Sequence, residues 1–330
     1  MKICICGGGG LGHVCAGVMA SQKDVELNIL SGHPENWQDM ITVTDLNGKQ
    51  YIAPIKRVSS KPEEVIVGQD IILFCLPGYM IEKTLRDIKP YIGNAAVGTV
   101  VSSTGFFFFA HDILGEKAKL FGFQRVPFIS RVVDYGKTAN LLGYKSSLAV
   151  VLENVETPED FRKELERLFI TPVMLLNSFY EVALSNSNPI LHTGRLYTMF
   201  QGREYEVFDH NILFYKEWTD EASQLLIDMD AEFFQLLDKL GVHTLPTLLD
   251  YYESDDAVSL TRKIRSIPAF QSITSPMKQV EGGWVADFGS RYFTEDFPFG
   301  LRWIKDLAEQ NNLILSNIDK VFSWGIGIIE

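Results

Sequence analysis

The sequence predicts an α/β protein in which a doubly wound parallel sheet is followed by a second, mostly α-helical domain. Three observations indicate this class. Short apolar runs alternate with segments of helical periodicity through residues 1–153, which is typical of βαβ units. A run of glycines follows the first apolar segment directly, at residues 7–10. From about residue 155 the apolar residues instead recur every three or four positions, as in packed helices.

The elements of the first domain, residues 1–153, follow from local composition. Buried strands are expected where β-prone apolar residues run together, at 2–6, 25–30, 71–76 and 95–101. Helical spacing predicts helices over 11–22 and 81–88. Asn47-Gly48 lies between two β-prone runs and predicts a hairpin. Residues 127–153 again have the composition of strands, with turns at 135–136 and 143–144.

The second domain is expected to span residues 154–330 and to be helical. Helices are predicted over 158–169, 213–240, 258–265 and 297–310. In the longest of them, apolar residues step by three or four from Phe214 to Leu240, and Gly241 follows as a helix stop. A stripe of this kind belongs to the core or to a subunit interface, so a homodimer is one assembly that the sequence allows.

Composition and charge exclude several classes of protein. Apolar residues make up 46% of the 330 residues and charged residues 22%, which excludes a disordered chain. The net charge is −12, which argues against a nucleic-acid-binding protein. Residues 1–150 carry 15 basic and 13 acidic residues, a balance of +2, whereas residues 151–330 carry 15 and 29, a balance of −14. The N-terminal half is therefore the better host for an anionic ligand.

The cysteines and the longest uncharged segment bear on compartment and membrane association. All four cysteines lie in apolar runs of the first quarter of the chain: Cys4, Cys6, Cys15 and Cys75. No second pair of metal ligands follows them in the sequence, so they predict buried reduced thiols of a cytoplasmic protein rather than a metal site. Residues 90–110 carry no charge, but glycine, serine and threonine interrupt them. We therefore expect no membrane span.

The glycine segment has the spacing of a dinucleotide-binding loop. Gly7, Gly9 and Gly12 satisfy G-x-G-x-x-G between an apolar strand and an amphipathic helix, the context that a Rossmann-type domain requires. The first glycine permits the tight turn, the second admits a pyrophosphate, and the third lets helix and strand pack closely. Gly10 and Leu11, inside the loop, are expected to contact the cofactor with them. FAD sites, S-adenosylmethionine sites and a merely structural turn share this pattern.

The segment after the second strand bears on the choice between NAD and NADP. NAD enzymes usually carry an acid there that binds the adenosine ribose, but this sequence reads Leu30-Ser31-Gly32-His33. Ser31 and His33 could instead face a 2′-phosphate, which favours NADP slightly, while the lack of an arginine leaves NAD open. An ordinary polar turn explains both residues equally well. Leu76 and Pro77 lie at the end of the strand expected at 71–76 and, by topology, are expected along the cofactor.

Two polar motifs in the second half carry the candidate chemistry. Asn188 and Pro189 predict the N-cap and first residue of a helix, which places His192 in its first turn and Arg195 on the same face. Asp296 is predicted to cap a later helix, and its carboxylate could orient His192. Taken locally, a packing histidine and a plain cap explain these two residues as well.

Three motifs together resemble the opine dehydrogenase family, which includes octopine and nopaline dehydrogenases. They are the N-terminal G-x-G-x-x-G domain, the Asn-Pro-x-x-His helix that ends at His192, and Arg-x-x-x-Glu-Asp-x-Pro-x-Gly over 291–300. The resemblance covers essentially the whole chain. It implies that His192 donates and accepts the proton, that Asp296 pairs with it, and that Arg291 positions the amino acid or the 2-oxo acid.

The resemblance also implies a reaction. Opine dehydrogenases reduce the imine formed between an amino acid and a 2-oxo acid, with NAD or NADP as cofactor. Arg291, together with Arg195, would then clamp a substrate carboxylate. Two alternatives stay open: a 2-oxo acid reductase similar to ketopantoate reductase, which needs no amine, and a nucleotide-binding protein that has lost catalysis.

Overall fold

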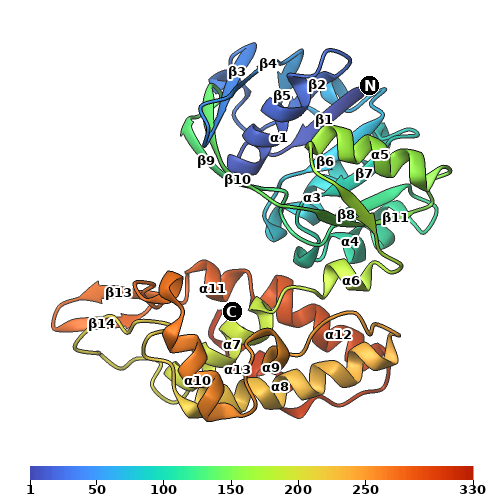
Figure 1. Cartoon of the computed structure of the whole chain (residues 1–330). Helices are drawn as coiled ribbons and strands as arrows, with labels where there is room; N and C mark the ends of the chain where they lie inside the picture. The colour runs from blue at the N-terminus through green and yellow to red at the C-terminus, as the bar shows by residue number, and fades with distance from the viewer. Residues whose placement is uncertain (330) are drawn as a thin grey trace. The chain divides into compact units, whose positions relative to one another are not determined.

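The computed structural model describes residues 1–329 and divides into two compact units, Met1–Ala183 and a second unit that begins at Leu184 (Figure 1). The first unit is built on an eight-stranded sheet in the order β12-β11-β8-β7-β6-β1-β2-β5. Its strands are β1 (Lys2–Cys6), β2 (Glu26–Leu30), β5 (Arg57–Ser59), β6 (Ile71–Phe74), β7 (Ala96–Thr99), β8 (Leu120–Phe123), β11 (Leu148–Glu153) and β12 (Val173–Leu175).

The winding of this sheet fixes where a ligand can bind. The six strands from β5 to β8 in the sheet order are all parallel, and only β11 pairs antiparallel, with β8. β1 lies between β2 and β6, so the strand order reverses at β1. Ligands of such sheets bind outside the carboxyl ends of the strands at this reversal. The predicted doubly wound parallel sheet is confirmed.

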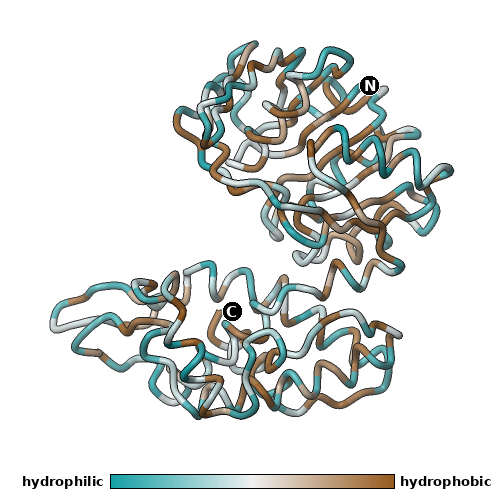
Figure 2. The backbone as a smooth tube through the Cα atoms, viewed as in Figure 1, coloured by the Kyte–Doolittle hydropathy of each residue, from teal (hydrophilic) through white to brown (hydrophobic). Residues whose placement is uncertain are grey.

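Helices cover both faces of the sheet because the strands are apolar on both sides. The helices of this unit are α1 (Gly10–Ala20), α2 (Pro62–Val65), α3 (Gly78–Ile88), α4 (Phe106–Leu114), α5 (Pro158–Phe169) and α6 (Tyr180–Ala183). Ile3 and Ile5 of β1 pack in the core with α1 and α5, whereas Cys4 and Cys6 pack in the core with α3 and α4. All four cysteines are buried and free. Apolar residues accordingly follow the central strands in Figure 2.

A second sheet of four strands packs against α1. It has the order β4-β3-β10-β9 and comprises β3 (Met40–Asp45), β4 (Gln50–Pro54), β9 (Phe128–Asp134) and β10 (Thr138–Tyr144). The predicted hairpin at Asn47-Gly48 is confirmed, with Gly48 at φ +79. The predicted turn at residues 135–136 is also present, but 143–144 lies within β10, beside a register shift.

The division between the units differs from the predicted one at 153/154. Residues 158–169 form a helix as expected, but Leu165, Leu168 and Phe169 of α5 belong to the core of the first unit. The strand that follows, β12, extends the first sheet by pairing with β11. The helical periodicity from about residue 155 therefore marks a last α/β crossover rather than a new domain.

The second unit is mostly helical, as predicted. It contains α7 (Asn188–Phe200), α8 (Asp220–Lys239), α9 (Leu248–Tyr251), α10 (Ala257–Ser266), α11 (Arg291–Thr294), the π-helical turn η5 (Phe297–Leu301), α12 (Arg302–Gln310), α13 (Ser316–Ile329) and the hairpin of β13 (Met277–Val280) and β14 (Gly283–Ala286). The central helix α8 contacts α7, α10 and α13. It begins at Asp220, capped by Thr219, and not at residue 213 as predicted.

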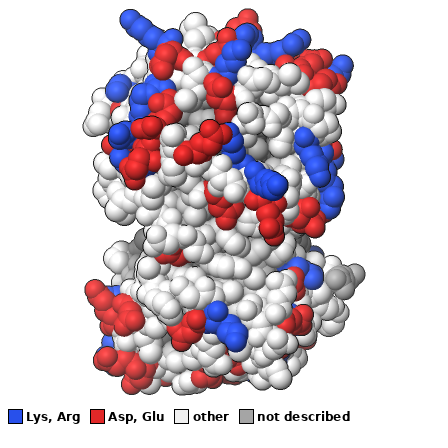
Figure 3. All heavy atoms as spheres, turned by 90° about the vertical axis from the view of Figure 1, so that its right-hand side faces the viewer, with Lys and Arg blue, Asp and Glu red and all other residues white. Residues whose placement is uncertain are grey.

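Over the face of the first unit shown in Figure 3, Lys and Arg side chains lie beside Asp and Glu side chains. Ion pairs also run along helices of this unit, such as Lys83–Asp87 and Arg86–Glu82 in α3. Among residues 1–329, no helix is both long and apolar enough to cross a membrane.

Candidate active site

The glycine loop between β1 and α1 has the geometry that its three spaced glycines predict. Gly7 has φ +120, a conformation that side chains disfavour, and a Cβ there would lie 2.5 Å from the carbonyl oxygen of Cys75. A Cβ on Gly12 would lie 2.0 Å from the carbonyl oxygen of Gly7, so helix and strand pack too closely for any side chain. A Cβ on Gly9, in contrast, would meet nothing within 4 Å.

The free space at Gly9 lies at the first turn of α1, for which Gly9 is the N-cap residue. An anion that approaches there meets unpaired N–H groups and the positive end of the helix dipole. The loop therefore has the cradle that a pyrophosphate requires. Gly10 differs from Gly9, because a Cβ on it would lie 3.0 Å from Ser130 Oγ of β9, and Leu11 packs against the core.

His13 fixes this loop from within α1. Its Nε2 accepts a hydrogen bond from the Gly136 amide at 2.7 Å, so its Nδ1–H donates to the Gly9 carbonyl at 3.0 Å. The ring also stacks on Trp37, with centroids 4.3 Å apart. Burial lowers the pKa of His13 below its ordinary value of 6.5, which keeps the ring neutral. His13 is thus a packing residue that ties the glycine loop to the β9–β10 turn.

A cluster of neutral hydrogen-bonding groups follows β2, where the adenosine ribose of a bound dinucleotide is expected. The Ser31 hydroxyl lies 3.1 Å from Tyr135 OH and accepts from Trp37 Nε1 and from the His33 amide, each at 3.2 Å. Ser31 and Tyr135 line a cavity of about 230 Å³ together with the glycine loop and Leu76. Pro77 is the N-cap residue of α3.

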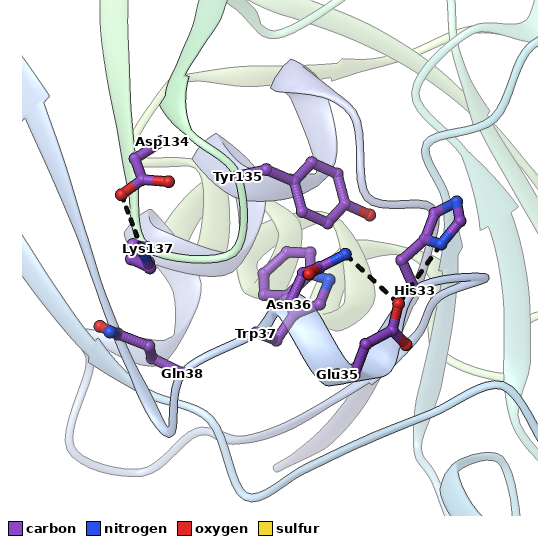
Figure 4. A pocket seen from close by; sticks show the side chains of 8 residues that line it. All are labelled: His33, Glu35, Asn36, Trp37, Gln38, Asp134, Tyr135 and Lys137. Carbon is purple, nitrogen blue, oxygen red and sulfur yellow. Dashed lines mark hydrogen bonds and ion pairs between the residues drawn. The ribbon is translucent and has the colours of Figure 1, made fainter.

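Tyr135 also lines a wider cavity of about 610 Å³, which is shown in Figure 4. The titratable side chains that line the wider cavity lie in pairs: His33 lies 3.5 Å from Glu35, and Lys137 lies 2.9 Å from Asp134. Figure 4 shows these pairs on opposite sides of the Tyr135 ring. The only carboxylate between Ser31 and Trp37 is therefore engaged with a neighbouring histidine.

The candidate catalytic pair lies within the second unit. Asp296 Oδ2 accepts a hydrogen bond from His192 at Nδ1, at 2.8 Å, although the two residues are 104 positions apart in the sequence. The two side chains are 11% and 19% exposed, so water screens the interaction only weakly. The predicted contact is present, while its role in catalysis stays a prediction.

Local packing explains how this contact forms. α7 begins at Asn188 with Ser187 as N-cap, one residue earlier than predicted, and His192 remains near its start. A Cβ on Gly300 would lie 2.7 Å from Pro189 Cγ, so the glycine of the Asp-x-Pro-x-Gly motif allows η5 to approach α7 closely. Asp296 precedes η5, and its carboxylate makes no cap hydrogen bond there. Asp296 thus occupies the N-cap position of η5, as predicted, but its side chain turns to His192 instead of capping the turn.

A tyrosine that the sequence analysis missed completes the group. Tyr215 OH lies 3.0 Å from His192 Nε2, so both ring nitrogens have a partner. Tyr292 covers the imidazole, with ring centroids 4.6 Å apart. Burial raises the pKa of Tyr215 and of Tyr292, so both hydroxyls keep their protons at neutral pH. The sequence does not indicate Tyr215, because residues 213–219 are predicted as part of a helix and Tyr215 lies off the apolar stripe of that helix.

The two candidate arginines have different surroundings. Arg195 is buried, and its guanidinium donates to the carbonyl oxygens of Phe214 at 3.2 Å and Glu217 at 2.8 Å. Burial lowers its pKa to about 10, so it remains a cation. These contacts indicate that Arg195 holds the 214–217 segment. The Arg291 side chain is 81% exposed and lies 3.3 Å from Glu295, and its predicted contact with substrate stays a prediction.

Known proteins share this sequence and fold. Residues 175–329 match the family described as NAD/NADP octopine/nopaline dehydrogenase, alpha-helical domain. Octopine dehydrogenase of Mizuhopecten yessoensis is 27% identical over 98% of this chain and 89% of its own length. Tauropine dehydrogenase of Arabella iricolor is 27% identical over 97% of this chain and 89% of its own. A solved octopine dehydrogenase structure superposes with a TM-score of 0.89 at 26% identity, covering 100% of this chain and 89% of that one.

The chain is therefore similar to opine dehydrogenases over nearly its whole length, and residues 175–329 match the helical domain of the octopine/nopaline dehydrogenases. It is accordingly a dehydrogenase that acts on CH–NH substrates, and the alternative of a silent nucleotide-binding protein is overturned. Its glycine loop lies in the first unit and the His192–Asp296 pair in the second.

Proposed function

We propose that this dehydrogenase joins an amino acid to a 2-oxo acid by reducing the imine that the two form. The observation that carries the proposal is the 2.8 Å hydrogen bond between His192 and Asp296, since it supplies an oriented proton donor and acceptor within the second unit. The solved octopine dehydrogenase, in complex with NADH and L-arginine, supports the same reaction class.

The residues of the first unit fit a nicotinamide dinucleotide. The open space at Gly9 would receive the pyrophosphate, Gly7 and Gly12 would keep the loop in shape, and Ser31 and Leu76 would line the adenosine end. When bound in its reduced form, the cofactor supplies a hydride to the imine carbon. The contacts of Gly10, Leu11 and Pro77 with the cofactor are part of the same proposal.

His192 moves the proton in this account. Asp296 accepts from Nδ1–H, which fixes the tautomer of the neutral ring and stabilises the imidazolium. The second nitrogen, Nε2, is then the one that exchanges a proton with the reacting group. In the reductive direction the protonated ring donates, and in the oxidative direction the neutral ring accepts. Arg291 would hold a substrate carboxylate, for which its exposed guanidinium offers two parallel N–H donors.

The ribose end of the cavity supports tolerance of both cofactors. Ser31, Tyr135 and Trp37 present neutral groups there, and the Glu35 carboxylate pairs with His33. A carboxylate would repel a 2′-phosphate, whereas hydroxyl groups can bind either a phosphate or a ribose hydroxyl. We therefore propose that NADH and NADPH both bind, and the slight preference for NADPH inferred from the sequence remains part of the proposal.

The test is turnover with and without an amine. NADH and NADPH oxidation is followed with 2-oxo acids such as pyruvate, alone and with a panel of amino acids that includes L-arginine. Oxidation that requires both the 2-oxo acid and an amino acid supports the proposal. Equal rates with and without every amino acid would contradict it and favour the 2-oxo acid reductase alternative.

A further inference from the structure

The second nitrogen of the catalytic histidine has a partner that neither motif of the family resemblance contains. Tyr215 OH lies 3.0 Å from His192 Nε2, on the side of the ring opposite to Asp296. The three side chains form one hydrogen-bonded chain, Asp296–His192–Tyr215. Each of them comes from a different segment of the second unit, so the chain exists only in the folded protein.

We infer that Tyr215 is a positioning residue that hydrogen-bonds His192 Nε2 both when the imidazole is protonated and when it is neutral, the two states that it adopts during the reaction. This inference rests on the proposed proton transfer by His192. A hydroxyl is suited to the task because it can both donate and accept. When the ring is neutral, Tyr215 O–H donates to the Nε2 lone pair. When the ring is protonated, Nε2–H donates to the Tyr215 oxygen.

The proton balance follows from this arrangement. In the reductive direction, Nε2–H leaves the Tyr215 oxygen, the proton passes to the reacting group, and the neutral nitrogen then accepts from the Tyr215 hydroxyl. The proton on Nδ1 stays with Asp296 throughout, and Tyr215 ends with the proton with which it began. Because burial raises the pKa of Tyr215, the hydroxyl takes part without ionising.

The surroundings of Tyr215 hold its hydroxyl in place. The ring stacks on Phe270, with centroids 4.1 Å apart and planes 21° from parallel, and lies parallel to Trp218 at 6.0 Å. Arg195 donates to the carbonyl oxygens of Phe214 and Glu217, which flank Tyr215 in the chain. The buried Arg195, one turn after His192 on α7, therefore fixes the backbone that carries Tyr215. This contact gives Arg195 a structural role.

The hydroxyl matters more to the protonated ring than to the neutral one. A hydrogen bond from a charged donor is about twice as strong as one between neutral groups. Loss of the hydroxyl should therefore disfavour the protonated state of the ring, and the pH profile of turnover should move to lower pH by about half a unit to one unit. The reductive and the oxidative profiles should move in the same direction.

The experiment compares Tyr215→Phe with Tyr252→Phe. The first variant keeps the stacked ring and removes only the hydroxyl. Tyr252 is a second buried tyrosine near Tyr215, and burial raises its pKa to about 12, but no hydrogen bond joins it to His192 in the described residues. We expect Tyr215→Phe to lower kcat by about 5–20-fold with KM nearly unchanged, and to shift both pH profiles downward. Tyr252→Phe should shift neither.

Other outcomes would separate the inference from the proposed function. If Tyr215→Phe leaves kcat within about twofold and both pH profiles in place while His192→Ala is inactive, Tyr215 does not position the histidine and the proposed function stands. If both phenylalanine variants shift the profiles equally, the effect is structural and the inference fails. If His192→Ala remains active, the proposed function itself is wrong. Should Tyr215→Phe fail to fold, 3-fluorotyrosine at position 215 provides the test, because its hydroxyl is a weaker acceptor and should shift the profiles in the same direction.

Discussion

Replacing Asp296 with asparagine removes the charge that faces His192 and keeps the shape of the side chain. The lost interaction is a charged hydrogen bond of 2.8 Å between two mostly buried groups. Such bonds contribute about 1.5–3 kcal/mol. Since about 1.4 kcal/mol corresponds to a tenfold change in rate, kcat should fall by about 10–150-fold. The amide can also turn its N–H₂ group toward Nδ1, which would impose the other tautomer on the ring.

The assay measures kcat and KM in the reductive direction with the best pair of amino acid and 2-oxo acid, and the dissociation constant of NADH by fluorescence. The NADH constant should not change, because the residues that line the cofactor cavity lie in the first unit. Asp228→Asn is the matched control, since Asp228 lies on α8 and bonds to Gln224 instead of the histidine. A kcat of Asp296→Asn within about twofold of the unmodified enzyme would show that the Asp296 carboxylate does not assist His192.

Three further predictions concern the cofactor loop, the substrate and stability. Gly9→Val should weaken NADH binding at least about 100-fold, a loss of ~2.7 kcal/mol of binding free energy, while the melting temperature stays the same because a Cβ there meets only open space. Gly327→Val is the control, since a Cβ at Gly327 also meets nothing within 4 Å. Tight NADH binding by Gly9→Val would disprove the assignment of the loop. Arg291→Lys should weaken catalysis with the 2-oxo acid by about 1–3 kcal/mol and leave NADH binding unchanged, and unaltered KM and kcat would assign Arg291 a structural role. Burial raises the pKa of Asp230 from 3.8 to about 6, so the fold loses stability as the pH rises through that range and Asp230 ionises. Asp230→Asn should therefore raise the free energy of unfolding by about 1–3 kcal/mol at pH ~7.5 and leave it unchanged below pH ~3.8. Urea unfolding at both pH values checks the last prediction, and an equal gain at both would contradict it.

The first unit could be predicted largely from local sequence. Its strands are short apolar runs. The glycine loop depends on the absence of side chains, which the sequence shows directly. The boundary was misplaced because α5 has the periodicity of any amphipathic helix. Only the pairing of β12 with β11 shows to which unit it belongs.

The candidate catalytic group was much less accessible to sequence reasoning. The pairing of His192 with Asp296 joins residues 104 positions apart, and it was proposed because two motifs together resemble a family, not because either motif requires it. Tyr215 had no such motif. Its segment, residues 213–219, is rich in apolar and aromatic residues and was predicted as helix, whereas the contacts of Arg195 with its carbonyl oxygens hold it outside α8. Tertiary hydrogen bonds of this kind leave no periodic signal in the sequence.

The proposed reaction forms a carbon–nitrogen bond between the amino acid and the 2-oxo acid. The most direct measurement is mass spectrometry of the product made from a ¹⁵N-labelled amino acid, a 2-oxo acid and NADH or NADPH, whichever supports turnover. We expect one product that contains the label and has the combined mass of both acids, less one water and plus two hydrogens, and that does not form with His192→Ala. A product without the label, the 2-hydroxy acid alone, would contradict the proposed reaction.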